Sequence, residues 1–523
     1  RGLKTILIEK NDFGAGTTSW SSRLVHGGLR YLEYFEFNLV RESLREREIL
    51  LRTAPHLVKP IEMTIPIYAQ GSRSYWEIQA GMVLYDLLSY DKTLPNHRML
   101  GAAKLKQLFR HLEPKGCKGA AQYYDGQVEY AERLCLEIVL SAQAAGADML
   151  SYVTVTELNR QGQRITALTC RDSETDEIFT VKGSDQAVVI NTAGPWVDQV
   201  CGRGVRGDDP APVGTTRKIG GTKGSHLFVE RFPGAPDQAL YVEALTDGRP
   251  FFILPWLDLC LIGTTDIRFD GDLEKICASD AEIDYLLRET NRVIPSAQLS
   301  RDSVVFTYAG VRPLPYAEGK KTSSITRSHV LHDHGKEQVE NMVSLIGGKL
   351  TTHRQVGEEM VEAALKKQGK PVGKSSARQA PLPGAPTAQT LTSATDRDVM
   401  AHLMTIYGAR AAEVYALVEE TPEQGEPIVD GLPDIKAQIV YTVQSEMART
   451  YLDICRRRTA LAVRADYGFD ALPVLASVLK QHCGWSLEKC DRNHTEYVQY
   501  MRDNCIPDYH LHKYESLIPA SVG

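Results

Sequence analysis

The opening run TILIE, residues 5–9, is the feature that most limits what this chain can fold into. It is a short β-branched apolar run that ends on an acid, and the turn-rich KNDFGAGTTSWSS follows it, which is typical of a buried parallel strand. A dinucleotide-binding fold begins with a strand, a GxGxxG turn and a helix, and an acid about 20 residues later holds the ribose hydroxyls. If Glu9 is that acid, the glycine fingerprint precedes Arg1, and we expect the sequence to lack the first strand and most of the first helix. An ordinary solvated strand end at Glu9 fits the spacing equally well.

The sequence also contains a literal GxGxxG match, GRGVRG, at residues 202–207. It follows the helical pattern WVDQVC and runs into DDPAP, so neither the preceding strand nor the following helix is present. The motif carries its meaning only in that strand-to-helix context, and we therefore reject it as a phosphate loop.

Hydrophobic periodicity predicts several further elements. Helical spacing indicates helices over residues 36–52 and 129–147. Apolar residues alternate over 61–67, which predicts a half-buried strand, and QAVVINTAGPW at 186–196 predicts a buried strand that leads into a glycine turn. The pieces SHLFVE, FFILPW and LCLIGTTD, within residues 225–266, predict successive strands of an antiparallel sheet.

Composition divides the chain into two large regions. Residues 366–389 are rich in Pro, Gly, Ser and Lys and have no periodicity, which indicates a linker. We expect residues 1–365 to form one region of strands and helices and residues 390–523 to form a helical C-terminal domain.

Charge, cysteine usage and hydropathy exclude several classes of protein. A net charge of −6 over 523 residues gives no basic field for nucleic acid. The ten cysteines form no CxxC pair and no Cys/His group at metal spacing, which indicates free thiols in a reducing compartment and no metal site. Because no apolar run approaches the roughly 18 residues that span a bilayer, we expect a protein that is soluble or lies on a membrane surface.

Seven segments occur in the order seen in one protein family. They are RGLKTILIEKNDFGAGTTSWSSRLVHGGLRYLE, NTAGPWVD, KGSHLFV, IGTTD, YAGVRPL, ITRSH and IGGKLTTHR. With VQSEMARTYLDICRRRTALA near the C-terminus, the sequence resembles the FAD-dependent glycerol-3-phosphate dehydrogenases over nearly its whole length. One departure is His353, because the family usually has a tyrosine before the arginine of the last segment.

The resemblance implies a fold and a reaction. The fold is α/β, with a Rossmann-like FAD-binding domain interleaved with an antiparallel-sheet substrate domain within residues 1–365, followed by the helical C-terminal domain. The reaction is the oxidation of sn-glycerol 3-phosphate to dihydroxyacetone phosphate by hydride transfer to FAD, with the electrons passed to a membrane quinone. Such an enzyme would be cytoplasmic and peripheral on the inner face of the cytoplasmic membrane. Whether it forms a homodimer is left open by the resemblance.

Three alternatives remain at this point. An oxidase would pass the electrons to oxygen, a flavin amine or amino-acid oxidase of the same superfamily would bind a carboxylate, and a paralogue without FAD would have no catalytic role. Oxidases of the family carry an extra insertion, and the anaerobic dehydrogenases carry a cysteine-rich C-terminal region. The sequence shows neither, which favours the quinone-linked type.

The reaction needs a site for a phosphate dianion and a base for the secondary hydroxyl proton. Arginine suits the phosphate because its fork binds two oxygens and stays charged. By resemblance, Arg30, Arg312 and Arg327 bind the substrate with Tyr31, and Arg312 lies nearest the reacting carbons. The motif KGSHLFV identifies His226 as the base, since a histidine near its ordinary pKa of about 6.5 suits proton abstraction at neutral pH. A structural histidine at a strand end is the alternative.

The resemblance also assigns residues to FAD. Glycine lets the backbone pass close to the flat ring, hydroxyls bond the diphosphate and ribityl chain, and a lysine stabilises negative charge on the ring. The predicted cofactor residues are Glu9, Thr18, Ser19, Ser21, Ser22, Gly27, Gly28, Val155, Ala193, Gly194, Gly347, Gly348, Lys349, Leu350 and Thr351. A helix-capping loop is the alternative for the hydroxyl cluster, and a surface turn is the alternative for the Gly-Gly-Lys string.

Two further patterns are interpreted as structural. The aromatics Tyr31, Tyr34, Phe35 and Phe37 have the spacing of core residues at the start of a helix, rather than of a membrane stripe. The basic run at residues 456–458 is interpreted as a solvated helix face, with contact to anionic lipid as the alternative.

Overall fold

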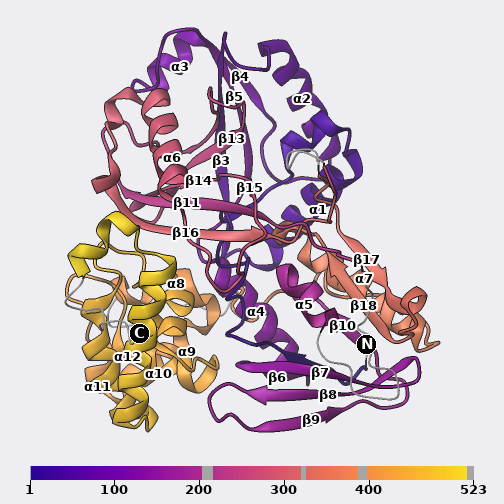
Figure 1. The fold of residues 1–523 in the computed structure, drawn as a ribbon. Helices are drawn as coiled ribbons and strands as arrows, with labels where there is room; N and C mark the ends of the chain where they lie inside the picture. Colours follow the sequence, from indigo (N-terminus) through magenta and orange to yellow (C-terminus); the bar gives the residue numbers. More distant parts are fainter. Residues whose placement is uncertain (1, 203–215, 320–324, 387–396, 515–523) are drawn as a thin grey trace.

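A large sheet, a group of smaller sheets and a helical C-terminal part make up the molecule (Figure 1). The computed structural model describes residues 2–202, 216–319, 325–386 and 397–514. The strand-rich regions alternate along the chain, so neither is formed by one continuous segment. Residues 203–207 of GRGVRG and the end of the predicted linker, residues 387–389, lie outside the described residues.

The large sheet is mostly antiparallel. Its strands are β2 (Leu24–Val25), β3 (Val58–Tyr68), β4 (Arg98–Gly101), β5 (Cys117–Val128), β11 (Thr222–Glu230), β12 (Ala239–Glu243), β13 (Pro250–Trp256), β14 (Leu259–Gly263), β15 (Ile267–Arg268) and β16 (Val304–Arg312). They run in the order β15-β11-β14-β13-β12-β3-β5-β2, with β16 beside β11 and β4 beside β5. The antiparallel strands predicted within residues 225–266 are therefore confirmed.

The smaller sheets contain the parallel pairs expected of a nucleotide-binding fold. Their strands are β1 (Ile6–Ile8), β6 (Asp148–Leu150), β7 (Val153–Gln161), β8 (Arg164–Asp172), β9 (Ile178–Lys182), β10 (Val189–Asn191), β17 (Val330–Asp333) and β18 (Met342–Ile346). β1 pairs in parallel with β6, and β10 pairs in parallel with β18. Because these strands alternate along the chain with those of the large sheet, the predicted interleaving is confirmed.

Helices cover both strand-rich parts and dominate the C-terminal part, which is orange to yellow in Figure 1. The earlier helices are α1 (Phe37–Thr53), α2 (Tyr75–Leu88), α3 (Ala102–Leu108), α4 (Ala131–Ala144), α5 (Val197–Gly202), α6 (Asp280–Val293) and α7 (His353–Lys367). The C-terminal helices are α8 (Arg397–Tyr407), α9 (Ala411–Glu420), α10 (Lys436–Ser445), α11 (Leu472–Cys483) and α12 (Leu487–Asn504). In the described part of the chain, none of these helices has the length and apolarity needed to cross a bilayer.

The predicted helices and strands are largely present, with two differences. Helices α1 and α4 match the predictions, but the strand within residues 186–196 is only β10, and a 3-10 helix, η2 (Gly194–Trp196), follows it. The strand at 61–67 is not half-buried, because Thr64 on its other face is also buried and accepts a hydrogen bond from Gln122 at 3.0 Å. β12 and β5 pair with the two edges of β3, and burial of successive residues such as Thr64 and Ile65 shows that both of its faces are covered.

Tyr34, Phe35 and Phe37 at the start of α1 are exposed, so the prediction that they are core residues is wrong. Phe35 is 78% exposed, Tyr34 41% and Phe37 38%. Tyr34 ends the 3-10 helix η1 (Leu29–Tyr34), and Phe35 caps it in a left-handed conformation with a φ of 57°. This turn directs the two side chains away from the sheet.

The basic run at residues 456–458 is buried, so both a solvated face and a lipid contact are wrong for it. Arg456, Arg457 and Arg458 are at most 4% exposed. Arg457 Nε and Arg458 Nη1 each donate to Asp12 Oδ2 at 2.7 Å, and Asp12 precedes Arg457 by 445 residues. Arg456 Nη1 donates to Glu132 of α4 at 2.6 Å. The run therefore ties the C-terminal part to the strand-rich region.

This network predicts a large cost for neutralising Asp12. Asp12→Asn removes the carboxylate that two buried guanidinium groups share and leaves Arg457 with Asp453 and Arg458 with Glu446, so the free energy of unfolding should fall by about 3 kcal/mol. Burial acts to raise the pKa of Asp12, but Arg458 and Arg457 outweigh it and hold that pKa below its ordinary value. The contribution is thus present above the unfolded-state pKa of about 3.9 and is lost as the pH falls through the folded-state value.

Urea unfolding of the wild type and of Asp12→Asn, at neutral pH and below pH 4, measures this difference. Asp470→Asn is the matched control, because Asp470 pairs with Arg464 at 2.7 Å on an exposed surface and is itself 41% exposed. The control should cost less than about 1 kcal/mol. Equal losses in the two variants would contradict the role given to Asp12.

Candidate active site

His226 lies on β11 and is enclosed by the large sheet. It stands opposite Tyr308 of β16, and the two rings stack with centroids 4.6 Å apart. On its other side it stands opposite Gly263 of β14, where an added Cβ would lie 2.3 Å from the imidazole Cδ2. Ser22 Oγ lies 2.8 Å from Nε2. The sheet register and the absent side chain at Gly263 therefore fix the ring.

The surroundings of His226 keep its ring neutral. Burial lowers the pKa of His226 well below its ordinary value, and the charges of Arg312 and then Arg23 lower it further. A neutral imidazole can accept a proton. The contact with the Ser22 hydroxyl shows that an O–H group fits against Nε2.

Two of the predicted substrate arginines meet at one carboxylate. Arg312 Nη1 lies 3.4 Å from Asp266 Oδ1, and Arg327 Nη2 lies 3.4 Å from Asp266 Oδ2. Burial acts to raise the pKa of Asp266, but Arg312 and Arg327 outweigh it and lower that pKa. Arg312 also donates to Thr264 at 3.1 Å, beside the glycine that faces His226. Gly224 leaves room for this guanidinium, since an added Cβ would lie 2.4 Å from Arg312 Nη2.

The other predicted substrate residues lie on η1. Tyr31 is close enough to Arg327, Arg312 and Arg30 for their charges to act against the burial that raises its pKa. Arg30 lies over the Tyr34 ring at 5.9 Å, and its buried Nε has no partner among the described residues. The structure therefore brings all three arginines and Tyr31 into one neighbourhood.

Lys349 adds a further cation to this group. Its Nζ lies 4.7 Å from the centre of the Tyr31 ring and donates to Ser43 Oγ at 2.6 Å. Burial lowers the pKa of Lys349 to about 7, and nearby carboxylates act against this. In the described part of the chain, no carboxylate lies within ion-pair distance of Nζ. A buried lysine in this situation favours an anionic ligand.

The glycines predicted to border the flavin are required by the protein's own packing. An added Cβ would lie 2.4 Å from the Tyr85 hydroxyl at Gly27 and 2.3 Å from the Tyr31 ring at Gly28. Gly28 also has a φ of 79°, a left-handed conformation that favours glycine. These contacts give a reason for both glycines, and their contact with a flavin stays a prediction.

The Gly-Gly-Lys turn is fixed to the segment before η1. Gly347 and Gly348 have φ values of 79° and 97°, and the short helix η7 (Leu350–Thr352) follows Lys349. Thr351 Oγ1 accepts from the backbone N–H of His26 at 3.2 Å and lies 3.3 Å from its carbonyl oxygen. Two motifs that are 325 residues apart thus meet here.

The residues predicted for the adenosine end lie on the smaller sheets. The Glu9 carbonyl accepts from the Val153 N–H at 2.9 Å, which places the start of β7 beside the end of β1. Val155 and Ala193 pack against the same hydrophobic cluster, and Gly194 begins η2 after Ala193. Burial raises the pKa of Glu9. The four residues share this region, and their contacts with a nucleotide stay predictions.

The predicted hydroxyl residues have different roles in the protein itself. Ser19 is 1% exposed and its hydroxyl donates to the Gly14 carbonyl at 2.7 Å. Ser21 Oγ accepts from the Arg23 N–H at 3.3 Å, and Ser22 contacts His226. Thr18 lies in the same turn as Ser19. A loop that closes on itself therefore accounts for part of the cluster, and its contact with a cofactor stays a prediction.

Several residues of the site were missed by sequence reasoning. Asp266 orients two arginines, Tyr308 stacks on His226, and Gly224 and Gly263 make room for the functional side chains. The glycines carried a usable signal, because glycine inside a strand often marks the close approach of another group. Asp266 and Tyr308 lie in the ordered segments IGTTD and YAGVRPL, but their roles became visible only with the pairing of strands.

The residues present fit a cofactor that is planar and anionic. Lys349 provides a buried cation without a carboxylate partner in the described chain, and His226 has a buried Nδ1 without a hydrogen-bond partner there. Gly28 has a left-handed conformation and lies next to Lys349, since an added Cβ there would lie 3.3 Å from Nζ. Lys349, Thr351 and the segment before η1 would hold the ring, and Glu9 and Val155 would hold the nucleotide end.

Comparisons with known proteins agree with this description. Residues 1–362 match the family described as FAD dependent oxidoreductase, and residues 375–490 match the C-terminal domain of alpha-glycerophosphate oxidase. The chain therefore belongs to the FAD dependent oxidoreductase family, and FAD is its cofactor. Within this family it falls among the FAD-dependent glycerol-3-phosphate dehydrogenases.

Three relatives illustrate the similarity. The glycerol-3-phosphate dehydrogenase of Synechocystis sp. is 60% identical over 522 residues, which covers 98% of this chain and 94% of that protein. The D-erythritol 1-phosphate dehydrogenase of Brucella abortus is 34% identical, with 88% and 90% covered. The FAD complex of the glycerol-3-phosphate dehydrogenase from Bacillus halodurans has a TM-score of 0.72 at 26% identity, with 96% and 90% covered.

Proposed function

We propose that the protein oxidises sn-glycerol 3-phosphate at its secondary hydroxyl, with His226 as the base and the arginine cluster as the phosphate site. One observation carries this assignment. A neutral, buried histidine lies close enough to Arg312 to feel its charge, and Arg312 shares the carboxylate of Asp266 with Arg327. FAD, when bound, supplies the acceptor for the hydride that leaves the same carbon.

Different residues of the chain accept the proton, stabilise the developing charge and bind the phosphate group. His226 takes the hydroxyl proton at Nε2, where the Ser22 hydroxyl lies in this structure. Arg312 stabilises the negative charge that develops on the substrate oxygen, because it is fixed by Thr264 and Asp266 before the substrate arrives. Arg327, Arg30 and Tyr31 hold the phosphate group. Burial of His226 and Tyr31 keeps water away from the proton transfer.

Kinetics of two variants test these roles. His226→Ala should lower kcat by about 100-fold or more while flavin content stays the same, because only proton transfer is lost. Arg327→Ala should mainly raise KM for glycerol 3-phosphate, because it removes a binding charge. The measurement is steady-state kinetics together with anaerobic bleaching of the flavin absorption by the substrate. Equal loss of flavin in both variants would show that these residues are structural.

The neutral state of His226 predicts the pH dependence of turnover. Because its pKa lies well below the ordinary value, the base stays unprotonated at pH values where a normal histidine is protonated. We expect kcat to remain constant from pH 8 to below about pH 6. kcat is the correct quantity, since the substrate phosphate itself titrates near pH 6 and affects kcat/KM. A fall of kcat centred near about 6.5 would contradict the effect of burial.

One observation favours a second substrate. The relative from Brucella abortus is named for D-erythritol 1-phosphate, and an arginine cluster binds any phosphate monoester. Bleaching with erythritol phosphate under the same anaerobic conditions compares the two substrates. Bleaching by amino acids would instead favour the amine oxidase alternative, and peroxide formed in air would favour the oxidase.

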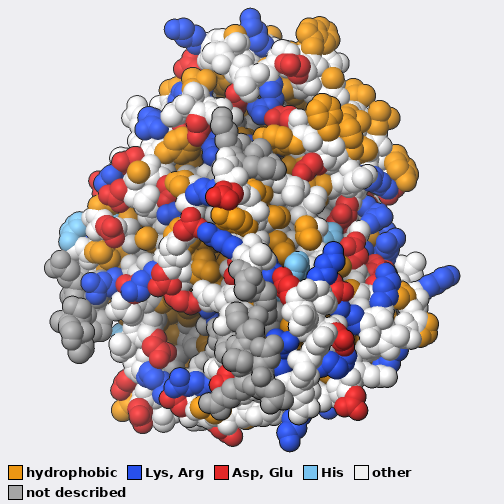
Figure 2. Space-filling model, turned by 45° about the vertical axis from the view of Figure 1, so that its right-hand side comes forward, with side chains coloured by type: hydrophobic (Ala, Val, Ile, Leu, Met, Phe, Trp, Pro, Cys, Tyr) orange, Lys and Arg blue, Asp and Glu red, His pale blue; other side chains and the backbone are white. Residues whose placement is uncertain are grey.

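We also propose that a membrane quinone accepts the electrons at a peripheral membrane contact, in the cytoplasm. Figure 2 shows apolar side chains gathered at the upper right of the face that is drawn there. An apolar patch combines α2, the turn after it and the end of η1: Phe35, Trp76, Leu87 and Tyr90 are 65–79% exposed. Tryptophan and tyrosine favour the membrane interface. η1 also carries Arg30 and Tyr31, so the patch lies near the site where electrons leave the substrate.

Removal of apolar area from this patch tests the contact. Trp76→Glu with Leu87→Glu should lower binding to vesicles of phosphatidylcholine and phosphatidylglycerol at least about tenfold, since burial of two large side chains is lost. Turnover with a water-soluble dye should stay unchanged, while the quinone-dependent rate falls. Ile178→Glu is the matched control, because Ile178 is 69% exposed on β9 at the other end of the molecule. Unchanged vesicle binding in the double variant would refute the contact.

A further inference from the structure

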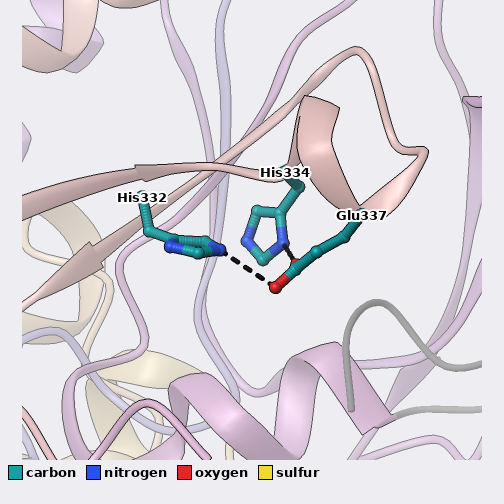
Figure 3. A group of neighbouring side chains, drawn as sticks. All are labelled: His332, His334 and Glu337. Atoms are coloured by element: carbon teal, nitrogen blue, oxygen red, sulfur yellow. Dashed lines mark hydrogen bonds and ion pairs between the residues drawn. The ribbon is translucent and has the colours of Figure 1, made fainter. Parts of the chain in front are cut away.

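Three metal-ligand side chains converge at the end of β17, outside the candidate active site. Figure 3 shows His332 on the strand and His334 and Glu337 on the short helix η6 (His334–Glu337), with their polar ends directed toward one another. Their ligand atoms all lie within 4.8 Å of one another. The pattern HxHxxE contains no cysteine, so spacings between cysteines do not reveal it.

The donor atoms suit a divalent transition metal. His332 Nε2 lies 3.2 Å from Glu337 Oε1, and His334 Nδ1 is hydrogen-bonded to Glu337 Oε2. Two imidazole nitrogens and one carboxylate oxygen are the protein ligands of open zinc sites, which keep a fourth position for water. Imidazole ligands also exclude magnesium and calcium, which prefer oxygen.

A second layer of side chains supports two of the three ligands. His334 Nε2 lies 2.7 Å from Ser344 Oγ of β18, so the nitrogen that would not bind metal already has a partner. Lys218 Nζ lies 3.2 Å from Glu337 Oε1, which leaves Oε2 for a metal. Outer partners of this kind orient the ligands of metal sites and fix the tautomer of the histidine.

One of the three ligands is open to solvent. His334 is fully buried, whereas the His332 side chain is 31% exposed and gives an ion a way in from solvent.

We propose that His332, His334 and Glu337 bind one zinc-class divalent ion per chain, with water as the fourth ligand. The ion would take the place of the proton between His334 Nδ1 and Glu337, and the neutral ring would carry its proton on Nε2, beside Ser344 Oγ. The ion would cross-link β17 to η6 beside β18. It would thereby stabilise the three-stranded sheet that β10, β18 and β17 form. The site is separate from the residues proposed for catalysis.

Isothermal titration of the chelator-treated, FAD-loaded protein with zinc sulfate tests the proposal. We expect one ion per chain and a rise in the temperature of unfolding. His332→Ala should weaken zinc binding at least about tenfold and remove the rise in unfolding temperature. His332 is suitable for this test because its side chain is partly exposed. His494→Ala is the matched control, because His494 is exposed on α12, and it should bind zinc as the wild type does.

Two results would overturn the site. One is the absence of stoichiometric binding by the wild type. The other is binding of one ion that persists unchanged in His332→Ala, which would assign the ion to other ligands such as the free thiols, of which Cys277 is exposed. Turnover is not the readout, so the outcome does not depend on the proposed reaction.

Discussion

The pairing of C-terminal arginines with carboxylates from the first part of the chain is the interaction on which the rest of the structure depends. Asp12 receives Arg457 and Arg458, and Glu132 receives Arg456 and, at 2.8 Å, Arg23. Buried pairs of this kind add little net stability over apolar packing, but the loss of one partner is costly. The network therefore acts mainly as a specific fastening, which holds the C-terminal part in one position against the loop between β1 and β2.

That fastening reaches His226 through a short chain of contacts. Arg456 lies over the Trp20 ring at 4.8 Å and donates to the Ser19 carbonyl at 3.1 Å. Trp20 packs against Tyr308 with ring centroids 5.5 Å apart, and Tyr308 stacks on His226. The helical C-terminal part therefore supports the position of His226, because Arg456 contacts the loop against which the stacked rings pack.

Local sequence patterns and ordered motifs were sufficient to predict part of the fold and part of the candidate site. They identified the interleaved fold, helices α1 and α4, and the arginines and histidine that the structure brings together. They failed where the environment of a residue depends on distant segments. Arg457 has the sequence neighbours of a solvated residue, but it is buried between Asp453 and a carboxylate 445 residues away, Asp12. Phe35 looks like a core residue, and only the left-handed turn at that position exposes it. Asp266 follows a short strand and acquires its role only when β11 and β16 bring Arg312 to it.

Several cations gather at the candidate site, and this links anion binding to the stability of the fold. The charges of Arg30, Arg312 and Arg327 act on Tyr31, and Lys349 lies over its ring. Asp266 is the carboxylate that Arg312 and Arg327 share, and burial holds the pKa of Lys349 at about 7 against nearby carboxylates. Cations kept close together in a poorly solvated region repel one another, so an anion that binds there relieves a cost already present in the folded chain. A phosphate dianion beside the arginines would therefore stabilise the fold as it binds, by the usual linkage of ligand affinity to stability. The charges proposed to bind the substrate would thus also link its binding to the stability of the fold.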